Sequence, residues 1–207
     1  MKLLSSGYQY DVYDLGNGLV LKQTVSFFFR LKKMFLVFRA DGFGVIESLV
    51  KAIRSNKASV ETTRRIGAML TPELGALLAN PRFKDRMSYE QDKITMVEDY
   101  IPAHAIDENK SMIDSYIKLR LELWRHGIHD YVFKFKGNHG VDAQGRVVLV
   151  DFNELYFTME EALQSIQGKK WLSLPQYRKW EEGELKSYYT KAMEEAMTEE
   201  NLNKNWR

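Results

Sequence analysis

Residues 126–155 constrain the fold of this chain more than any other part of its sequence. They contain two short runs typical of β-strands, residues 140–142 and 146–150, joined by a turn over residues 143–145. Gly145 ends that turn and supplies the positive φ angle that a tight hairpin needs. The sequence therefore predicts an antiparallel β-hairpin whose two outer ends lie close together.

Two side chains with hard oxygen atoms flank this predicted hairpin. Asn138 precedes its first strand, and Asp151 follows its second strand 13 residues later. Because antiparallel pairing brings the two ends together, a carboxamide and a carboxylate converge there. Mg²⁺ binds through one or two such ligands and completes its shell with water and substrate phosphate. The pattern therefore predicts a magnesium site formed by Asn138 and Asp151.

This arrangement resembles the metal-binding core of the protein-kinase-like fold. In that family an Asn after the catalytic loop and the Asp of an Asp-Phe-Gly motif hold the metal ions on ATP. Here Asn138 is followed by the hairpin and by Val-Asp-Phe at residues 150–152, with Asn153 where the family has Gly. No His-Arg-Asp triplet precedes Asn138. The nearest counterpart of the catalytic base is Asp130, eight residues before Asn138, where the family has about five.

The N-terminal region resembles the nucleotide-binding strands of the same family. Residues 3–23 alternate and break like three short strands, and residues 15–18 form a strong hairpin turn. Gly7 resembles the glycine of a phosphate loop, and Lys22 resembles the strand lysine that reaches the α- and β-phosphates. A lysine facing inward from an apolar strand is costly unless it meets an anion. An ordinary β-meander with Lys22 at a strand end is the alternative.

The resemblance also implies a glutamate that orients Lys22. A helix that begins at Ser59, with this residue as its N-cap, would supply Glu61. Glu61 is preferred to Glu47, which lies on a separate predicted helix over residues 45–54, because the helix of Glu61 directly precedes the next strand pair. A solvated helix carboxylate is the alternative for Glu61.

Residues 74–83 and 94–101 are predicted to form strands around a polar turn. Glu98 and Tyr100 would then lie in the hinge between lobes, where the resemblance places backbone groups that bind adenine. Pro102 is expected to end the second strand.

Residues 26–39 are both apolar and basic. Six apolar side chains follow helical spacing, and four Lys and Arg residues lie between them. The six are Phe27, Phe28, Leu31, Met34, Phe35 and Phe38. An internal helix that covers the sheet is the preferred interpretation. A membrane-surface helix through residues 27–39 is the alternative, because such helices combine a basic face with an aromatic one.

A second amphipathic helix is predicted over residues 111–125, and it leads the chain into the segment before Asn138. His126, His129 and Asp130 suggest a transition-metal site, but a clear third ligand is missing and structural hydrogen bonds are preferred for the histidines. Lys134 and Lys136 are placed to neutralise phosphate charge, with two solvated loop lysines as the alternative.

Composition narrows the classes of protein to which the chain belongs. The 207 residues carry a formal net charge of +2 and contain no cysteine, so neither nucleic-acid binding nor a thiolate metal site is indicated. No apolar run reaches the length of about 18 residues that suggests a membrane span. A cytoplasmic location is therefore expected.

Together these patterns predict an α+β chain with a two-lobed protein-kinase-like fold. A small antiparallel β-sheet N-lobe covers residues 1–102, and a shortened, mainly helical C-lobe covers residues 103–207. No Ala-Pro-Glu motif follows Asp151, which implies that a peptide platform is missing. The implied function is an ATP- and Mg²⁺-dependent phosphotransferase acting on a small-molecule or protein acceptor, with Asp130 as proton acceptor. A non-catalytic kinase-like (pseudokinase) binding or regulatory module is the alternative.

Overall fold

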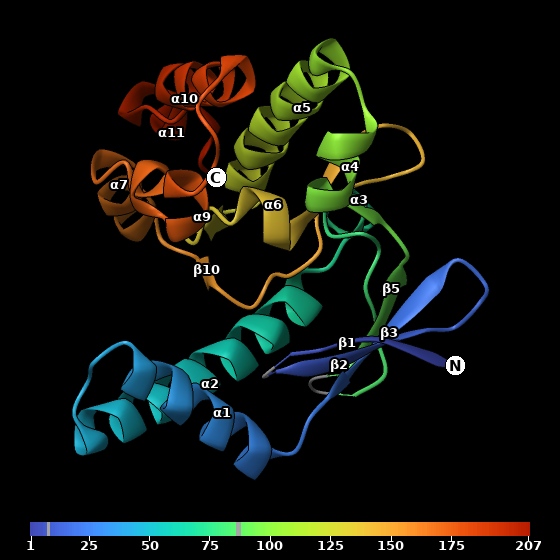
Figure 1. Ribbon diagram of the computed structural model, residues 1–207, viewed down its shortest axis with the longest axis vertical. Coiled ribbons are helices and arrows are strands. Elements are labelled where there is room, and N and C mark those ends of the chain that lie inside the picture. Colours follow the sequence, from blue (N-terminus) through green and yellow to red (C-terminus); the bar gives the residue numbers. More distant parts are fainter. Residues whose placement is uncertain (8, 86–87) are drawn as a thin grey trace. The chain divides into compact units, whose positions relative to one another are not determined.

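The computed structural model describes residues 1–7, 9–85 and 88–207. It confirms the α+β class: a five-stranded antiparallel sheet near the N-terminus is followed by a mostly helical region with two small sheets (Figure 1). The chain divides into two compact units, Met1–Leu70 with Asn80–Lys93 and Thr71–Ala79 with Ile94–Arg207. The predicted boundary, Pro102, lies inside the second unit.

The first unit holds the sheet and two long helices. Its strands have the order β1-β2-β3-β5-β4, and its elements are β1 (Lys2–Ser6), β2 (Tyr10–Asp14), β3 (Leu19–Thr24), α1 (Phe27–Ala40), α2 (Val45–Met69), β4 (Arg82–Phe83) and β5 (Tyr89–Asp92). The three strands predicted for residues 3–23 are confirmed. Lys22 pairs with Val12 on β2 and with Tyr89 on β5, so the register gives all three side chains the same face of the sheet.

Helix α2 corrects the predicted break at residue 59. The chain forms one continuous helix, and Ser59 is buried in its interior instead of capping a new N-terminus. The Ser59 carbonyl accepts a hydrogen bond from the Thr63 hydroxyl at 3.0 Å. No Gly or Pro stands in residues 45–66, so nothing in the backbone chemistry ends the helix before Met69.

Helix α1 packs mainly against α2, and the ammonium of Lys33 on α1 also donates a hydrogen bond to the Gly7 carbonyl, so the helix that was expected to cover the sheet is packed chiefly on another helix. Within α1, all of which is described, Arg30 and Met34 are the only buried residues. The main contacts of α1 are with α2, and the two helices lie side by side in Figure 1.

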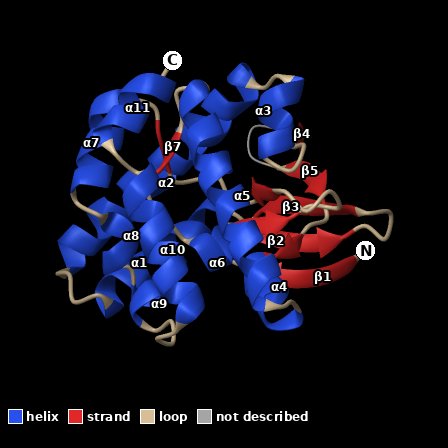
Figure 2. Ribbon diagram, turned by 90° about the horizontal axis from the view of Figure 1, so that it is seen from above, coloured by secondary structure: helices blue, strands red, loops and turns tan. Residues whose placement is uncertain are grey.

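The second unit is built around the helix α5 (Ile106–Arg125), which contains the predicted helix 111–125. Figure 2 shows that helices make up most of the chain outside the five-stranded sheet. The other elements of this unit are α3 (Pro72–Leu77), β6 (Thr95–Met96), α4 (Val97–Ala103), β7 (His129–Asp130), α6 (Phe135–Asn138), β8 (His139–Val141), β9 (Val147–Leu149), β10 (Leu155–Tyr156), α7 (Met159–Gln167), α8 (Lys170–Ser173), α9 (Pro175–Arg178), α10 (Glu184–Ala196) and α11 (Glu199–Asn205). Its small sheets are β6-β8-β9 and β10-β7, and α10 and α11 pack on α5.

Helices α3 and α4 replace most of the strands predicted for residues 74–83 and 94–101. The Thr71 hydroxyl accepts a hydrogen bond from the Leu74 amide at 3.2 Å, and Pro72 occupies the first turn of α3. Thr followed by Pro is a recognised helix start, so the sequence did contain this signal. Pro102, predicted to end a strand, lies inside α4.

Gly140 lies where β8 passes closest to the segment leading into β6. A Cβ atom at this position would lie 2.4 Å from Cγ2 of Ile94 and 2.8 Å from the Thr95 carbonyl oxygen. Gly140→Ala is therefore expected to lower the free energy of unfolding by about 1–3 kcal/mol, measured by chemical denaturation. Gly137→Ala is the matched control, because a Cβ there meets nothing within 4 Å. Equal stability of the two variants would contradict this packing.

Candidate functional site

The predicted hairpin is confirmed as strands β8 and β9. His139 pairs with Leu149 and Val141 with Val147, and Gly145 has a φ of 75°. The Asp142 carboxylate closes the turn by accepting hydrogen bonds from the backbone amides of Gln144 and Arg146, both at 2.9 Å. The turn that the sequence identified thus sets the register of the two strands.

The hairpin brings Asn138 and Asp151 together at its open end. The Asn138 carbonyl oxygen accepts hydrogen bonds from the Val150 amide at 2.8 Å and from the Asp151 amide at 3.1 Å. Asn138 is only 6% exposed, yet its side-chain amide makes no hydrogen bond with any residue that the structure describes. Its amide atoms are not among the fully buried unpaired ones, so water or a ligand can reach them.

Asn153 holds the Asp151 carboxylate in place. Its side-chain nitrogen donates a hydrogen bond to Oδ1 of Asp151 at 2.6 Å, and Asn153 itself is 4% exposed. The Oδ2 atom of Asp151 has no hydrogen bond among the described residues. Asn153 therefore supplies a group that orients this carboxylate.

Among the described residues, no self-sufficient metal cage surrounds Asn138 and Asp151. Among residues 1–7, 9–85 and 88–207, no group of three or more His, Asp or Glu side chains is placed to hold a metal ion. The transition-metal alternative around His126, His129 and Asp130 therefore gains no support. A carboxylate and an amide oxygen suit Mg²⁺, which takes its remaining ligands from water and phosphate.

Asp130 is engaged in a buried ion pair. Arg120, on α5, donates a hydrogen bond from Nη1 to Oδ2 of Asp130 at 2.6 Å, and both side chains are 1% exposed. Oδ1 of Asp130 accepts the Val132 amide at 3.2 Å. The guanidinium also lies 4.0 Å from the ring centre of Phe133. The residue predicted as proton acceptor thus has a structural partner on each carboxylate oxygen.

Two buried histidines near this ion pair have lowered pKa values. Nδ1 of His129 accepts the Trp124 indole N–H at 2.9 Å, and burial holds the pKa of His129 well below its usual range. Burial likewise lowers the pKa of His139 to about 4, although Nε2 of His139 lies 3.7 Å from Oδ2 of Asp130. The structural role preferred for His129 from the sequence is confirmed.

Glu154 is a candidate that the sequence interpretation missed. Burial raises its pKa, the nearby Asp151 adds to that rise, and the Lys134 ammonium opposes it from 3.4 Å. Lys134 therefore lies beside the Glu154 carboxylate, and its predicted role in neutralising phosphate charge stays a prediction. Glu154 follows Asp151 by three residues, but nothing in that spacing distinguishes it from a surface glutamate.

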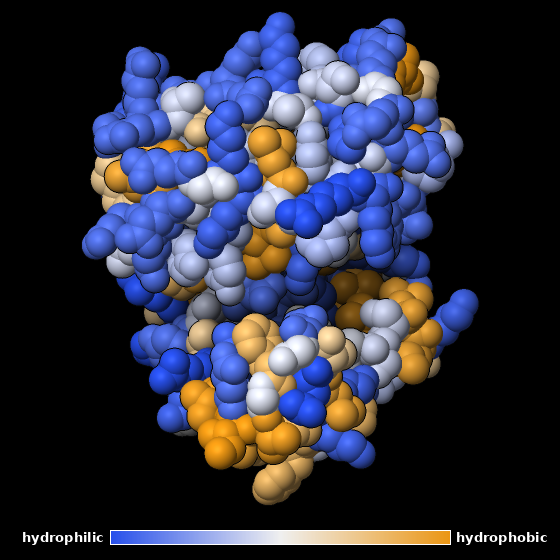
Figure 3. Space-filling view, turned by 60° about the vertical axis from the view of Figure 1, so that its left-hand side comes forward, coloured by the Kyte–Doolittle hydropathy of each residue, from blue (hydrophilic) through white to orange (hydrophobic). Residues whose placement is uncertain are grey.

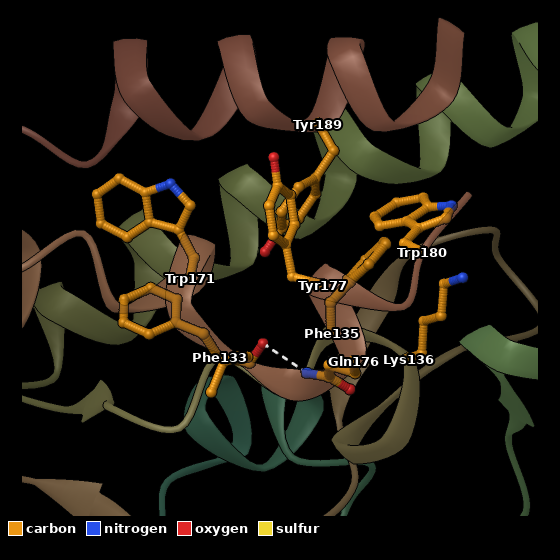
Figure 4. A pocket seen from close by; sticks show the side chains of 9 residues that line it. Phe133, Phe135, Lys136, Trp171, Gln176, Tyr177, Trp180 and Tyr189 are labelled. Carbon is orange, nitrogen blue, oxygen red and sulfur yellow. Dashed lines mark hydrogen bonds between the residues drawn. The ribbon is translucent and has the colours of Figure 1, made fainter. Parts of the chain in front are cut away.

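Lys136 lies beside a different feature, an aromatic pocket. Its ammonium sits 4.2 Å from the ring centre of Trp180, and burial lowers its pKa. Figure 4 shows Lys136 and Trp180 at one end of the pocket, with Trp171 and Phe133 at the other. The free volume of about 10 Å³ matches a single water molecule, so this pocket is a packing gap.

The predicted phosphate residues Gly7 and Lys22 belong to the first unit. Gly7 donates its amide to the Tyr10 carbonyl at 2.8 Å, and its own carbonyl accepts from Nζ of Lys33 at 3.1 Å. Lys22 is 6% exposed on β3, with its ammonium 5.6 Å from the Tyr89 ring centre. Lys22 therefore faces inward, as its place in an apolar strand suggested.

Glu61 does not have the predicted arrangement. Its carboxylate accepts hydrogen bonds from Nε of Arg64 at 2.9 Å and from Nη2 of Arg64 at 2.6 Å, and its side chain is 59% exposed. These bonds lower the pKa of Glu61. The pair lies at i and i+3 of one helix face, so the predicted role of orienting Lys22 is corrected to a surface ion pair.

Glu98 and Tyr100 do not form an extended hinge. Both lie in the short helix α4. The Tyr100 ring stacks on His104 with 3.6 Å between ring centres, and the Tyr100 carbonyl lies 2.8 Å from Nδ1 of His104. The structure therefore places these two residues in a helix and not in the extended segment that the sequence predicted.

A substitution at Asp130 separates a structural role from a catalytic one. Asp130→Asn keeps the size of the side chain but leaves the Arg120 charge buried without a counter-ion. We expect the free energy of unfolding to fall by about 3–5 kcal/mol, measured by urea denaturation. The control Asp107→Asn changes a side chain that is 90% exposed and is expected to cost less than about 1 kcal/mol. A fully stable Asp130→Asn variant would contradict the structural role.

Comparison of the sequence with protein-family models gives no match, and comparison with curated proteins also gives none.

Proposed function

We propose that this protein binds ATP together with Mg²⁺ through Asn138 and Asp151, as a kinase-like binding or regulatory module. The observation that carries the proposal is the nearly buried Asn138 carboxamide, which has no hydrogen-bond partner among the described residues and lies beside Asp151 at the end of the hairpin. An amide oxygen and a carboxylate oxygen on two residues that meet at the end of a hairpin suit a hard cation that also binds phosphate.

Each residue of this site has a distinct role in the proposal. Asn138 and Asp151 would hold the metal ion, Asn153 orients Asp151 through its 2.6 Å hydrogen bond, and Lys134 adds positive charge near the phosphates. A bound Mg²⁺ neutralises phosphate charge.

The environment of Asp130 favours binding over catalysis. A general base must reach the hydroxyl whose proton it accepts, whereas Asp130 is 1% exposed and bonded to Arg120 and to the Val132 amide. A proton acceptor with that environment is unavailable to a substrate. The binding module therefore agrees better with the geometry than a phosphotransferase that depends on Asp130.

A phosphotransferase is the second candidate, and Glu154 is the observation that favours it. This carboxyl group lies near Asp151 and Lys134, and its raised pKa is typical of residues that exchange protons. In this version of the site, Glu154 accepts the proton from a small-molecule or protein hydroxyl while that oxygen attacks the γ-phosphorus. The bond between that phosphorus and the bridging oxygen breaks, and ADP leaves.

Nucleotide binding is tested by thermal unfolding with ATP, in the presence and absence of Mg²⁺. A ligand that binds only the folded state adds about 2.7 kcal/mol at one hundred times its Kd, so we expect a Mg²⁺-dependent rise in Tm. Asp151→Asn and Asn138→Ala are expected to abolish the Mg²⁺-dependent part. Asp107→Asn, the exposed control, should keep it. The proposal is wrong if wild-type protein shows no Mg²⁺-dependent shift at millimolar ATP.

Catalysis is tested by phosphate release and by transfer from radiolabelled ATP to candidate acceptors. If Glu154 is the proton acceptor, Glu154→Gln lowers turnover by about 10²–10⁴-fold and leaves the Mg²⁺-dependent thermal shift intact. Glu200→Gln, at an exposed position of α11, serves as the control. A wild-type protein that binds Mg²⁺ and ATP without turnover supports the module, whereas turnover that Glu154→Gln leaves unchanged eliminates Glu154 as the base.

A further inference from the structure

Helices α1 and α2 expose an unusual number of large apolar side chains. Phe28 is 81% exposed and Ile46 is 80% exposed. We call this surface the α1–α2 patch, and its members are Phe27, Phe28, Phe29, Leu36, Val37, Val45, Ile46, Leu49 and Val50. Figure 3 shows apolar residues gathered in the lower part of the molecule, at the level of α1 and α2 in Figure 1. Exposed apolar surface on this scale marks an interaction site.

Basic residues interleave with the apolar ones on the solvent side of α1. Phe28, Lys32, Leu36 and Arg39 follow helical spacing along one stripe, and all four are exposed. Met34 is buried toward the other side of the helix. The solvent side of α1 therefore presents apolar groups and positive charge together.

The start of α2 also presents apolar and basic side chains together. Val45, Ile46 and Val50 line a hollow whose border holds Glu47, Lys51 and Arg54. The Lys51 ammonium lies 3.9 Å from the Glu47 carboxylate and 4.1 Å from the ring centre of Phe43, in the turn that joins the two helices. The hollow thus has apolar walls and a charged edge with two basic groups and one acidic group.

Charge is concentrated in this helical pair. Residues 26–58 contain seven Lys and Arg against two Asp and Glu, a net charge of +5, whereas the whole chain carries +2. The rest of the chain is therefore net acidic. A partner that matches the α1–α2 patch must combine negative charge with an apolar interior.

We propose that the α1–α2 patch docks on the surface of an anionic lipid bilayer. Aromatic and aliphatic side chains of such helices enter the boundary between headgroups and acyl chains, while Lys and Arg contact anionic headgroups. A second copy of this chain is a poorer match, because a symmetric contact would bring together two helical segments that each have a net positive charge over residues 26–58. No described helix has the length and apolar character needed to cross a bilayer, so the helices lie along the membrane surface.

Flotation of the full chain with lipid vesicles tests this assignment. We expect it to float with phosphatidylcholine vesicles that contain about one-third phosphatidylserine in about 0.1 M salt. Binding should fall at least tenfold with pure phosphatidylcholine vesicles or in about 0.5 M salt, because the surface potential is then absent or screened.

Two variants separate the apolar contribution to vesicle binding from the basic contribution. The double variant Phe28→Ser with Ile46→Ser changes two of the most exposed side chains, and Lys32→Glu reverses one charge of the α1 stripe. Each is expected to weaken vesicle binding about tenfold or more. The controls are Leu3→Ser, at a site 51% exposed on β1, and Lys191→Glu, at a site 76% exposed on α10. Both controls should bind like wild type, and all variants should keep the wild-type Tm.

Several outcomes would overturn the proposal. One is the absence of flotation at low salt, and another is equal binding by wild type and the Phe28→Ser, Ile46→Ser variant. A third is a concentration-dependent dimer, seen by sedimentation velocity, that the same variant abolishes while vesicle binding is absent. That result would assign the α1–α2 patch to a second copy of the chain. Each outcome is independent of whether ATP binds.

Discussion

The buried ion pair between Arg120 and Asp130 holds the part of the second unit that carries Asp151 and Glu154. Removing two charges from water is costly, and the attraction repays that cost only when the geometry is good and other hydrogen bonds are satisfied. Here Arg120 bonds both the carboxylate and the carbonyl oxygen of Asp130, so it fixes side chain and backbone together. Because Asp130 pairs with Leu155 in the β7–β10 sheet, the ion pair also fixes the chain just after Glu154.

The segment from Asp151 to Glu154 is therefore anchored at both ends. At its start the Asp151 amide bonds the Asn138 carbonyl, and at its end Leu155 is paired with β7. Between these anchors Asn153 bonds the Asp151 carboxylate. Side chains that bind a ligand are positioned more precisely when surrounding contacts hold them. This short segment is held at both ends and carries the acidic side chains of Asp151 and Glu154.

The sequence predicted local features well and long-range pairing poorly. The hairpin and the first three strands follow from turn residues and alternation, which act over a few neighbours. Arg120 was missed although it falls on the apolar stripe of α5 with Ile113, Tyr116 and Trp124, a position where a charge needs a buried partner. Glu154 could not be assigned, because its burial depends on contacts between distant segments. The Glu61–Arg64 pair was missed although its i, i+3 spacing on one helix is a local signal.

Motif order also assigned roles that the local environment does not support. Asp130 and Glu98 have the residue types that the resemblance requires, but one lies in a buried ion pair and the other in a helix. The chemistry of a carboxylate depends on its partners and its exposure. A sequence motif therefore locates the candidate region around Asn138, but it does not by itself identify which residues act in the site.

The path of the chain between the two units has a consequence for biosynthesis. The chain leaves the first unit after Leu70, builds α3 in the second, and then returns to add β4 and β5. Strand β5 lies between β3 and β4 in the finished sheet. Until the ribosome has released residue 92, β3 presents an open edge of unpaired backbone groups, which is a template for aggregation. The nascent sheet thus depends on rapid completion, or on a chaperone that covers this edge during synthesis.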